Sequence, residues 1–200
     1  NNFAAMESEI LEMSLRLSGM GNQIGLAEGE VMGLAAALTS VGIQAELGGG
    51  AFSRAMSRVQ SAVKAGGDRL EEFGQVAGMS GEEFATAFED RPQEAIVAFL
   101  KGLDGINKSG GDVYATLNNL GLTGTEIADV MTRASAAWDT VAEAMDTGNQ
   151  GFEDGNALLE EAAARFETTE SKVTMARNAI VHLGQDIGES FLPVVGSAAE

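Results

Sequence analysis

Apolar residues recur at helical spacing along most of the chain. In the first segment they alternate in steps of three and four, with glutamates at other positions; they are Phe3, Met6, Ile10, Met13, Leu17 and Met20. This period is typical of an amphipathic helix, which we expect over roughly residues 3–18. Gly19 and Gly21 are expected to end this helix.

Further helices are expected between glycines. One covers roughly residues 28–41, with Gly42 as its C-terminal cap, and another covers Phe52–Val63 between breaks at Gly48–Gly50 and Gly66-Gly67. Four more follow, with polar or proline signals at their starts. They are Asp68–Val76 with Asp68 as cap, Pro92–Leu103 with Pro92 in the first turn, Val113–Leu120 with Ser109 and Asp112 as caps, and a longer helix from after Thr123 to about Met145.

Three of the expected helix starts share one pattern, in which a glycine precedes an apolar residue and a glutamate follows. They are Leu26–Val31, Met79–Phe84 and Leu122–Ile127. Ser80 with Glu83, and Thr123 with Glu126, have the spacing of a capping box, whereas Ala27 cannot cap the first start. The pattern indicates either a duplicated unit or separate helix starts that obey the same rules.

Beyond a joint expected at residues 147–151, a heptad pattern begins. Apolar residues fall seven apart at Phe152, Leu159, Phe166, Val173, Ile180 and Ile187. This indicates a helix over Asn156–Glu189, about 50 Å long, which would end before Leu192-Pro193. It would either self-associate or pack on another long helix, through Leu159, Phe166, Val173, Ile180 and Ile187, or lie on the preceding domain as an ordinary amphipathic helix.

Together these patterns predict an all-α protein in two parts. Residues 1–150 are expected to form a compact bundle of short helices, and residues 151–200 a long heptad-patterned helix that projects from it. The composition agrees, because aromatic residues make up 6% of the chain and there are only 2 prolines. The chain of 200 residues begins without methionine and ends within a pattern, so we expect it to be a piece of a longer protein.

The net charge argues against polyanions as binding partners of this protein. Thirty acidic against twelve basic residues give a net charge of −18. Contacts to nucleic-acid phosphates or to anionic lipids need clustered lysine and arginine, so we expect neither partner. Apolar runs such as Val31–Leu38 are too short to span a bilayer, and no membrane segment is expected.

Candidate catalytic chemistry is sparse. The chain has no cysteine, and His182 is its single histidine, which rules out thiolate and multi-histidine metal centres. His182 and Asp186 could share a helix face, but a solvated or structural histidine explains them better. Neighbouring acids such as Glu71-Glu72 are interpreted as solvated charge, and the glycine-rich pieces lack the residues of a phosphate-binding loop. We therefore expect no catalytic, cofactor-binding or metal-ligating residue, no cofactor and no enzymatic activity.

Glycines spaced by four are common, as at Gly21, Gly25, Gly29 and Gly33. In a helix each costs roughly 1 kcal/mol against alanine. This leads to the hypothesis that the protein folds marginally or changes shape.

The order of several stretches resembles phage tail tape measure proteins of the TP901 type. These stretches are Ile24–Ile43 with its Ala/Leu-rich helix and Val-Gly turn, the acid and small-residue patch Glu46–Gly50, the arginine-bearing helix Phe52–Val63, the helix start Met79–Phe88, the Ala-rich stretch Leu117–Ala137, and Leu183–Val195, where a helix reaches Leu-Pro. Each stretch is weak alone, but their order covers most of the chain.

The resemblance implies a structural, mostly helical protein of the virion tail, present in the host cytoplasm during assembly. Such proteins span the tail tube, set its length and leave ahead of the DNA at infection. Their partners are the tail tube protein, tail assembly chaperones and tail-tip proteins. An alternative of another class is an acidic helical protein–protein interaction module, an adaptor without catalytic activity.

Overall fold

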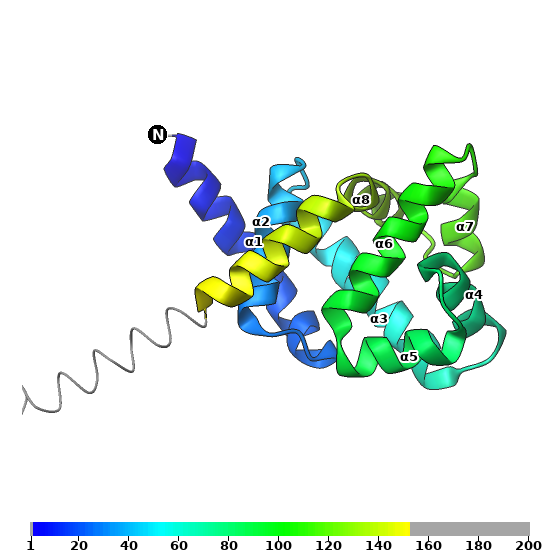
Figure 1. Ribbon diagram of the computed structural model, residues 1–200. Helices are drawn as coiled ribbons and strands as arrows, with labels where there is room; N and C mark the ends of the chain where they lie inside the picture. Colours follow the sequence, from blue (N-terminus) through cyan, green and yellow to red (C-terminus); the bar gives the residue numbers. More distant parts are fainter. Residues whose placement is uncertain (1, 153–200) are drawn as a thin grey trace, which may run out of the picture. The chain divides into compact units, whose positions relative to one another are not determined.

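A computed structural model describes residues 2–152 of the chain, with side chains from residue 8 onward, and this part is all-α. It has no β-strand within those residues, as the apolar period predicted. The elements, labelled in Figure 1, are α1 (Asn2–Ile24), α2 (Glu28–Ser40), the π-helical turn η1 (Ala45–Gly49), α3 (Gly50–Ala65), α4 (Asp68–Ala77), α5 (Gly81–Asp90), α6 (Pro92–Lys108), α7 (Val113–Asn119) and α8 (Thr125–Ala136). Residues 138–152 form a further helix, drawn in yellow.

The described residues pack around one continuous apolar core, and all belong to one compact unit. Near α4, α5 and α6 the core is built from phenylalanines. The Phe73 ring lies with its centroid 5.4 Å from that of Phe99 and 6.0 Å from that of Phe84, and all three side chains are buried. Aromatic pairs at this spacing add to the free energy gained by burying their area.

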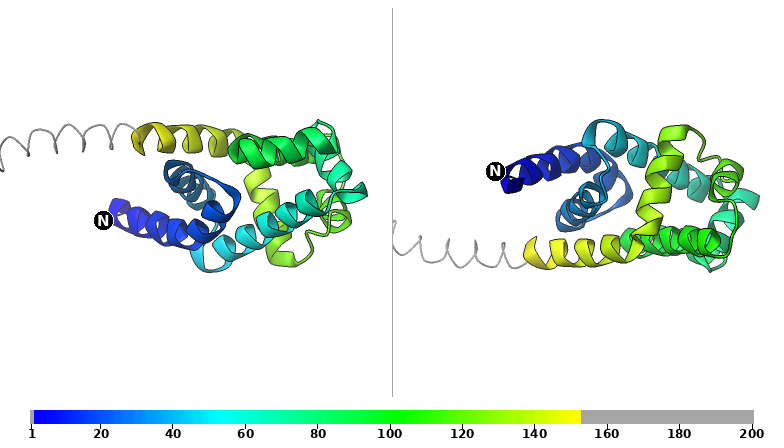
Figure 2. Two further views of the ribbon diagram at one scale, coloured as in Figure 1. Left: turned by 90° about the horizontal axis from the view of Figure 1, so that it is seen from below. Right: turned by 90° about the horizontal axis from the view of Figure 1, so that it is seen from above.

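Helix α2 lies between α1 and the helix of residues 138–152, as both views in Figure 2 show. Glycines make the second of these contacts close. A Cβ atom on Gly29 would lie 2.6 Å from the Asn149 Cα, and one on Gly33 would overlap the Ala144 carbonyl. The same holds on the other helix, because a Cβ on Gly148 would overlap the Gly29 carbonyl oxygen. Small residues thus let two backbones touch here, and the four-residue glycine spacing serves packing.

Several helix ends lie where the local sequence predicts them. Gly42 has φ +76° after α2, and Gly66 and Gly67 have φ +68° and +75° after α3, a left-handed conformation that glycine adopts at low cost. Pro92 begins α6, which continues past the expected Leu103 to Lys108. The Asp112 carboxylate accepts a hydrogen bond of 2.9 Å from the Ala115 N–H and caps α7.

The expected end of α1 is wrong. The helix runs through Gly19 and Gly21 and ends at Ile24, directly before Gly25, which has φ +85°. A Cβ on Gly21 would overlap the Val31 side chain, so this glycine is required by the contact with α2 and not by a turn. The glycine run at Gly48–Gly50 is likewise no break, because η1 leads directly into α3. Gly49 is buried there against Met13 and Arg16 of α1.

Asp68 does not cap α4, because Gly67 occupies the N-cap position and Asp68 begins the helix. Its carboxylate still lies in the first turn, where a negative charge interacts favourably with the helix dipole. The Ser80–Glu83 capping box forms as expected: the Glu83 N–H donates to the Ser80 hydroxyl at 3.2 Å and the Ser80 N–H to the Glu83 carboxylate at 2.8 Å.

The capping box expected at Thr123 does not form. Gly124, with φ +115°, is the N-cap of α8, and no side chain caps this helix. Two arginines of α3 bind the residues of the expected box. The Arg58 guanidinium donates to the Thr123 carbonyl at 2.8 Å and to its hydroxyl at 3.2 Å, and Arg54 pairs with Glu126 at 2.5 Å. The tertiary contact therefore replaces the local one.

The three similar helix starts each follow the same kind of helix end. Gly25, Gly78 and Gly121 have positive φ, and the apolar residue after each donates its N–H to a carbonyl five residues back. This is the Schellman arrangement, followed at once by a new helix. At the first start the Ala27 N–H donates to the Glu30 carboxylate at 2.7 Å, which is half of a capping box.

Two further expectations fail near the end of the described part. The single helix expected to Met145 is interrupted at Ala137, which has φ −120° between α8 and the next helix. Residues 147–151 are helical and form no joint, because Gly148 packs against α2. Three expectations lie outside the described residues: the heptad helix Asn156–Glu189, its apolar positions from Leu159 to Ile187, and the pair His182–Asp186.

Candidate functional site

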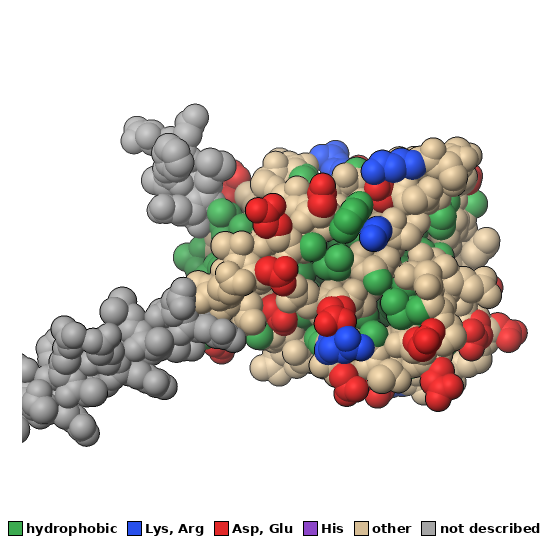
Figure 3. All heavy atoms as spheres, viewed as in Figure 1, with side chains coloured by type: hydrophobic (Ala, Val, Ile, Leu, Met, Phe, Trp, Pro, Cys, Tyr) green, Lys and Arg blue, Asp and Glu red, His purple; other side chains and the backbone are tan. Residues whose placement is uncertain are grey.

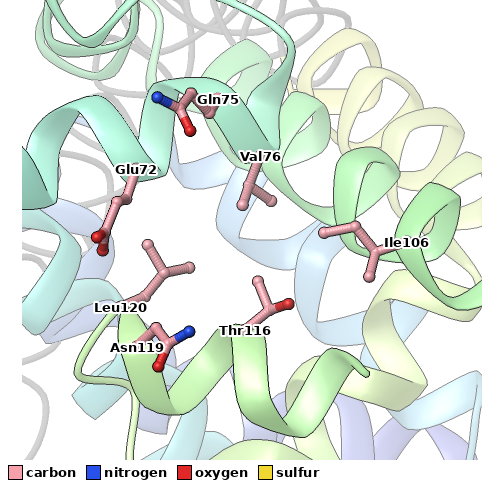
Figure 4. Close-up of a pocket in the computed structure, with 7 residues that line it drawn as sticks. All are labelled: Glu72, Gln75, Val76, Ile106, Thr116, Asn119 and Leu120. Carbon is pink, nitrogen blue, oxygen red and sulfur yellow. The ribbon is translucent and has the colours of Figure 1, made fainter. Parts of the chain in front are cut away.

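A polar pocket lies between α4, α6 and α7. Its volume is about 360 Å³, and Figure 4 shows the seven side chains that surround it: Glu72, Gln75, Val76, Ile106, Thr116, Asn119 and Leu120. Glu72 and Gln75 come from α4, and Thr116 and Asn119 face them from α7. Glu72 is the one titratable group in this lining, so the pocket holds no pair of titratable groups that could divide the roles of acid and base. The lining offers hydrogen bonds to a polar molecule and no reactive pair.

An apolar groove of about 310 Å³ lies between α1 and α2. We call it the α1/α2 groove, and it is lined by Leu11, Ser14, Leu15, Ser18, Asn22, Leu26, Glu28, Val31 and Met32. Leu11 is 55% exposed, Leu15 68% and Met32 44%, which makes them half of the six large apolar side chains that stand exposed in the described part. Their grouping in one groove distinguishes them from the singly scattered apolar residues of an ordinary surface.

Met32 also borders a second hollow, between α2 and the helix of residues 138–152. Gly33, Ala36, Ala144 and Gly148 contribute to it, together with Met32, Thr140, Glu143 and Thr147. Met32 therefore forms a ridge between two hollows on one surface. The Ser14 hydroxyl lies 3.3 Å from the Met32 sulfur, which places the side chain over the α1/α2 groove.

The signal for this groove is present in the sequence, although the helical stripe from Phe3 to Met20 leaves it out. Leu11 and Leu15 are four residues apart and lie off that stripe, so they form a second apolar line on α1. Within that stripe Met13, Leu17 and Met20 are buried in the core. Only the fold shows that no other described element covers the second line.

Two charged groups elsewhere in the described part have pKa values that are shifted by structural partners. The pKa of Glu83 is lowered by hydrogen bonds from the Ser80 backbone and then its hydroxyl. The pKa of Lys108 is raised by its hydrogen bond to Asp104 and by the negative charges of Asp104 and Asp139. Asp104 is a buried carboxylate, 6% exposed, and Lys108 lies 2.6 Å from it on the next turn of α6.

Glu71, one of the neighbouring acids named from the sequence, and Glu83 of the capping box also have structural partners. The Glu71 carboxylate accepts a hydrogen bond of 3.1 Å from the Gly81 N–H, and Glu83 completes its capping box. Among the side chains described, from residue 8 to residue 152, no three acidic or histidine side chains come together as metal ligands would. Nor is any helix in that range both long enough and apolar enough to cross a bilayer.

Comparisons with known proteins do not place the chain: no protein family, curated protein or solved structure matches it.

Proposed function

We propose that the chain is part of a phage or prophage tail tape measure protein, which sets tail length, supports assembly of the tail tube and is released when the genome is ejected. The observation that carries the proposal is the order of the stretches from Ile24–Ile43 to Leu183–Val195, which resembles the TP901 type. The all-α character of the described residues is compatible with it. The partners would be the tail tube protein, tail assembly chaperones and tail-tip proteins, and the location the virion tail.

A helical ruler has a simple physical basis, because each residue of an α-helix adds about 1.5 Å to its length. The stretch Asn156–Glu189, with its heptad of apolar residues, is the part of the sequence best suited to this role. Self-association through Leu159, Phe166, Val173, Ile180 and Ile187, or packing on another long helix, would stabilise it.

The test is an in-frame deletion of Asn156–Glu189 in the gene that encodes the chain, with tail lengths measured by electron microscopy. These 34 residues predict tails about 50 Å shorter. The matched control replaces the same stretch with an unrelated helix-forming sequence of equal length, which should restore tail length. Tails of unchanged length in the deletion would exclude the stretch from the ruler.

One observation favours a second candidate, an acidic helical interaction module without catalytic activity. The exposed α1/α2 groove is a surface of the kind that binds helical segments of partners. Mass spectrometry of purified virions separates the two candidates: the tape measure proposal requires the chain in the particle, whereas an adaptor that acts in the cell would be missing from it.

A further inference from the structure

The α1/α2 groove is apolar at its base and exposed at its rim. Val31 and Leu26 are buried at its base, and Leu11, Leu15 and Met32 stand exposed along it. Burying an apolar side chain is favourable, so leaving three large ones exposed forgoes a gain in free energy that a partner could realise. Methionine suits such a surface, because its unbranched thioether adapts to differently shaped apolar partners.

The groove has the length of a short helix. On α1 its lining extends from Leu11 to Asn22, which corresponds to about 16 Å along the helix, or three turns. A third helix laid between two helices buries apolar side chains at i, i+3, i+4 and i+7. Three such turns would bring three or four anchoring side chains into contact with Leu11, Leu15 and Met32.

The charged residues around the groove indicate the sign of the charge that a partner would carry. Helices α1 and α2 and residues 138–152 carry eight acidic residues and a single basic one, Arg16, whose guanidinium lies 2.9 Å from Glu12. The intervening residues 41–137 carry thirteen acidic and eight basic residues, so all but one of the basic residues in the described part belong to elements that do not line the groove. Figure 3 shows acidic side chains beside apolar ones at the end of the body where α1 and α2 lie. Glu28 borders the groove itself, and Glu143 borders the adjoining hollow.

This asymmetry argues against a second copy of the chain as the occupant. Two copies would bring two strongly acidic surfaces together, and like charges at an interface oppose association. A basic segment gains from the same field, both in affinity and in association rate.

We propose that the α1/α2 groove binds an amphipathic helix of another protein, with apolar side chains at helical spacing facing Leu11, Leu15 and Met32 and with lysine or arginine along its flanks facing Glu28 and Glu143. The inference does not depend on the tape measure proposal, since the tail-length experiment can fail while this one succeeds, and the reverse.

The experiment uses the full chain and a fluorescent synthetic peptide of about 20 residues, with leucine at i, i+3, i+4 and i+7 and lysine on its other face. Affinity is measured by fluorescence anisotropy. We expect Leu15→Glu and Met32→Glu each to weaken binding at least about tenfold. The matched control is Leu47→Glu, because Leu47 is 60% exposed on η1 outside the groove, and it should leave the affinity unchanged.

The substitutions separate groove binding from general attraction between opposite charges. Each adds a negative charge, which would strengthen a purely electrostatic association with a lysine-rich peptide. A loss of affinity in Leu15→Glu therefore reports the apolar contact. Glu28→Gln tests the charge contribution and should weaken binding a few-fold, with the effect vanishing at high salt.

Other outcomes would overturn the proposal. They are equal binding of a control peptide with glutamate in place of lysine, an equal loss of affinity in Leu47→Glu, or no binding by the wild-type chain. A dimer in sedimentation equilibrium that Leu15→Glu dissociates would make the groove an interface between copies. A third outcome is that the peptide does not bind, while amide exchange across α1 is slow in the wild type and faster in Leu15→Glu. This would mean that the chain's own residues fill the groove.

Discussion

A Cβ atom on Gly33 would lie 2.6 Å from the Met145 Cα atom, so α2 and the helix of residues 138–152 touch through their backbones. Glycine is unfavourable within a helix, but here the close approach requires it. The contact joins residues more than a hundred positions apart in the sequence. Gly33 and Ala144 also line the hollow between these two helices, which Met32 borders.

Replacing Gly33 with alanine is expected to destabilise the protein by about 1–3 kcal/mol, because the overlap with the Ala144 carbonyl outweighs the gain in helix propensity. The matched control is Gly19→Ala, at a helical glycine of α1 with open space around it, which should stabilise by up to about 1 kcal/mol. Urea unfolding measures both. Equal stabilisation by the two substitutions would contradict the close crossing.

Arg58 is expected to hold the loop before α8 in place. It donates to the Gly121 carbonyl at 3.0 Å and to the Thr123 carbonyl at 2.8 Å. Arg58→Met should cost about 1–3 kcal/mol and speed amide exchange around Thr123, because hydrogen bonds from a charged donor are lost. Arg54→Met removes only an exposed ion pair with Glu126 and should cost less than about 1 kcal/mol. If Arg54→Met proved as destabilising as Arg58→Met, the loop contact would not be the stronger one.

The capping box at α5 predicts a pH dependence. The pKa of Glu83 is lowered in the folded protein by the Ser80 N–H and hydroxyl, so the ionised carboxylate stabilises the fold above the pKa of the unfolded chain. That stability is lost as the pH falls through the folded pKa. Titration of the Glu83 carboxyl carbon by NMR should show the lowered pKa in the wild type and a higher value in Ser80→Ala. An unchanged pKa in that variant would argue against the hydroxyl's contribution.

Asp104 and Lys108 predict the opposite dependence at high pH. The pKa of Lys108 is raised, first by its hydrogen bond to Asp104, so its stabilising effect is present below the unfolded pKa and is lost as the pH rises through the folded value. Lys108→Met leaves the buried Asp104 carboxylate without this partner and should destabilise at pH 7. Asp104→Asn in the same background should recover part of the loss, since a neutral amide costs less to bury. Thermal melts across pH check both; no recovery in the double variant would contradict the explanation.

Interactions that span a few residues could be predicted from the sequence alone. The all-α class follows from the apolar period, and the ends at Gly42 and Gly66 follow from the low cost of positive φ at glycine. The Ser80–Glu83 box forms because donors and acceptors three residues apart meet whenever a helix begins there.

The tertiary structure decided which glycines end helices and which bring them together. Gly42 ends a helix, whereas Gly21 and Gly148 lie inside helices, where Val31 and Gly29 occupy the space that a Cβ atom would need. At Thr123 a local capping box lost to Arg58, since a charged donor from α3 binds the same hydroxyl.

The exposure of the α1/α2 groove was also decided by the tertiary structure. The amino-acid sequence places Leu11 and Leu15 on one line of α1, because helical spacing is a local property. Whether that line is covered depends on where α2 and the later helices pack, which is set by contacts between residues far apart in the chain. Those contacts leave Leu11, Leu15 and Met32 exposed together, and no local pattern carries that information.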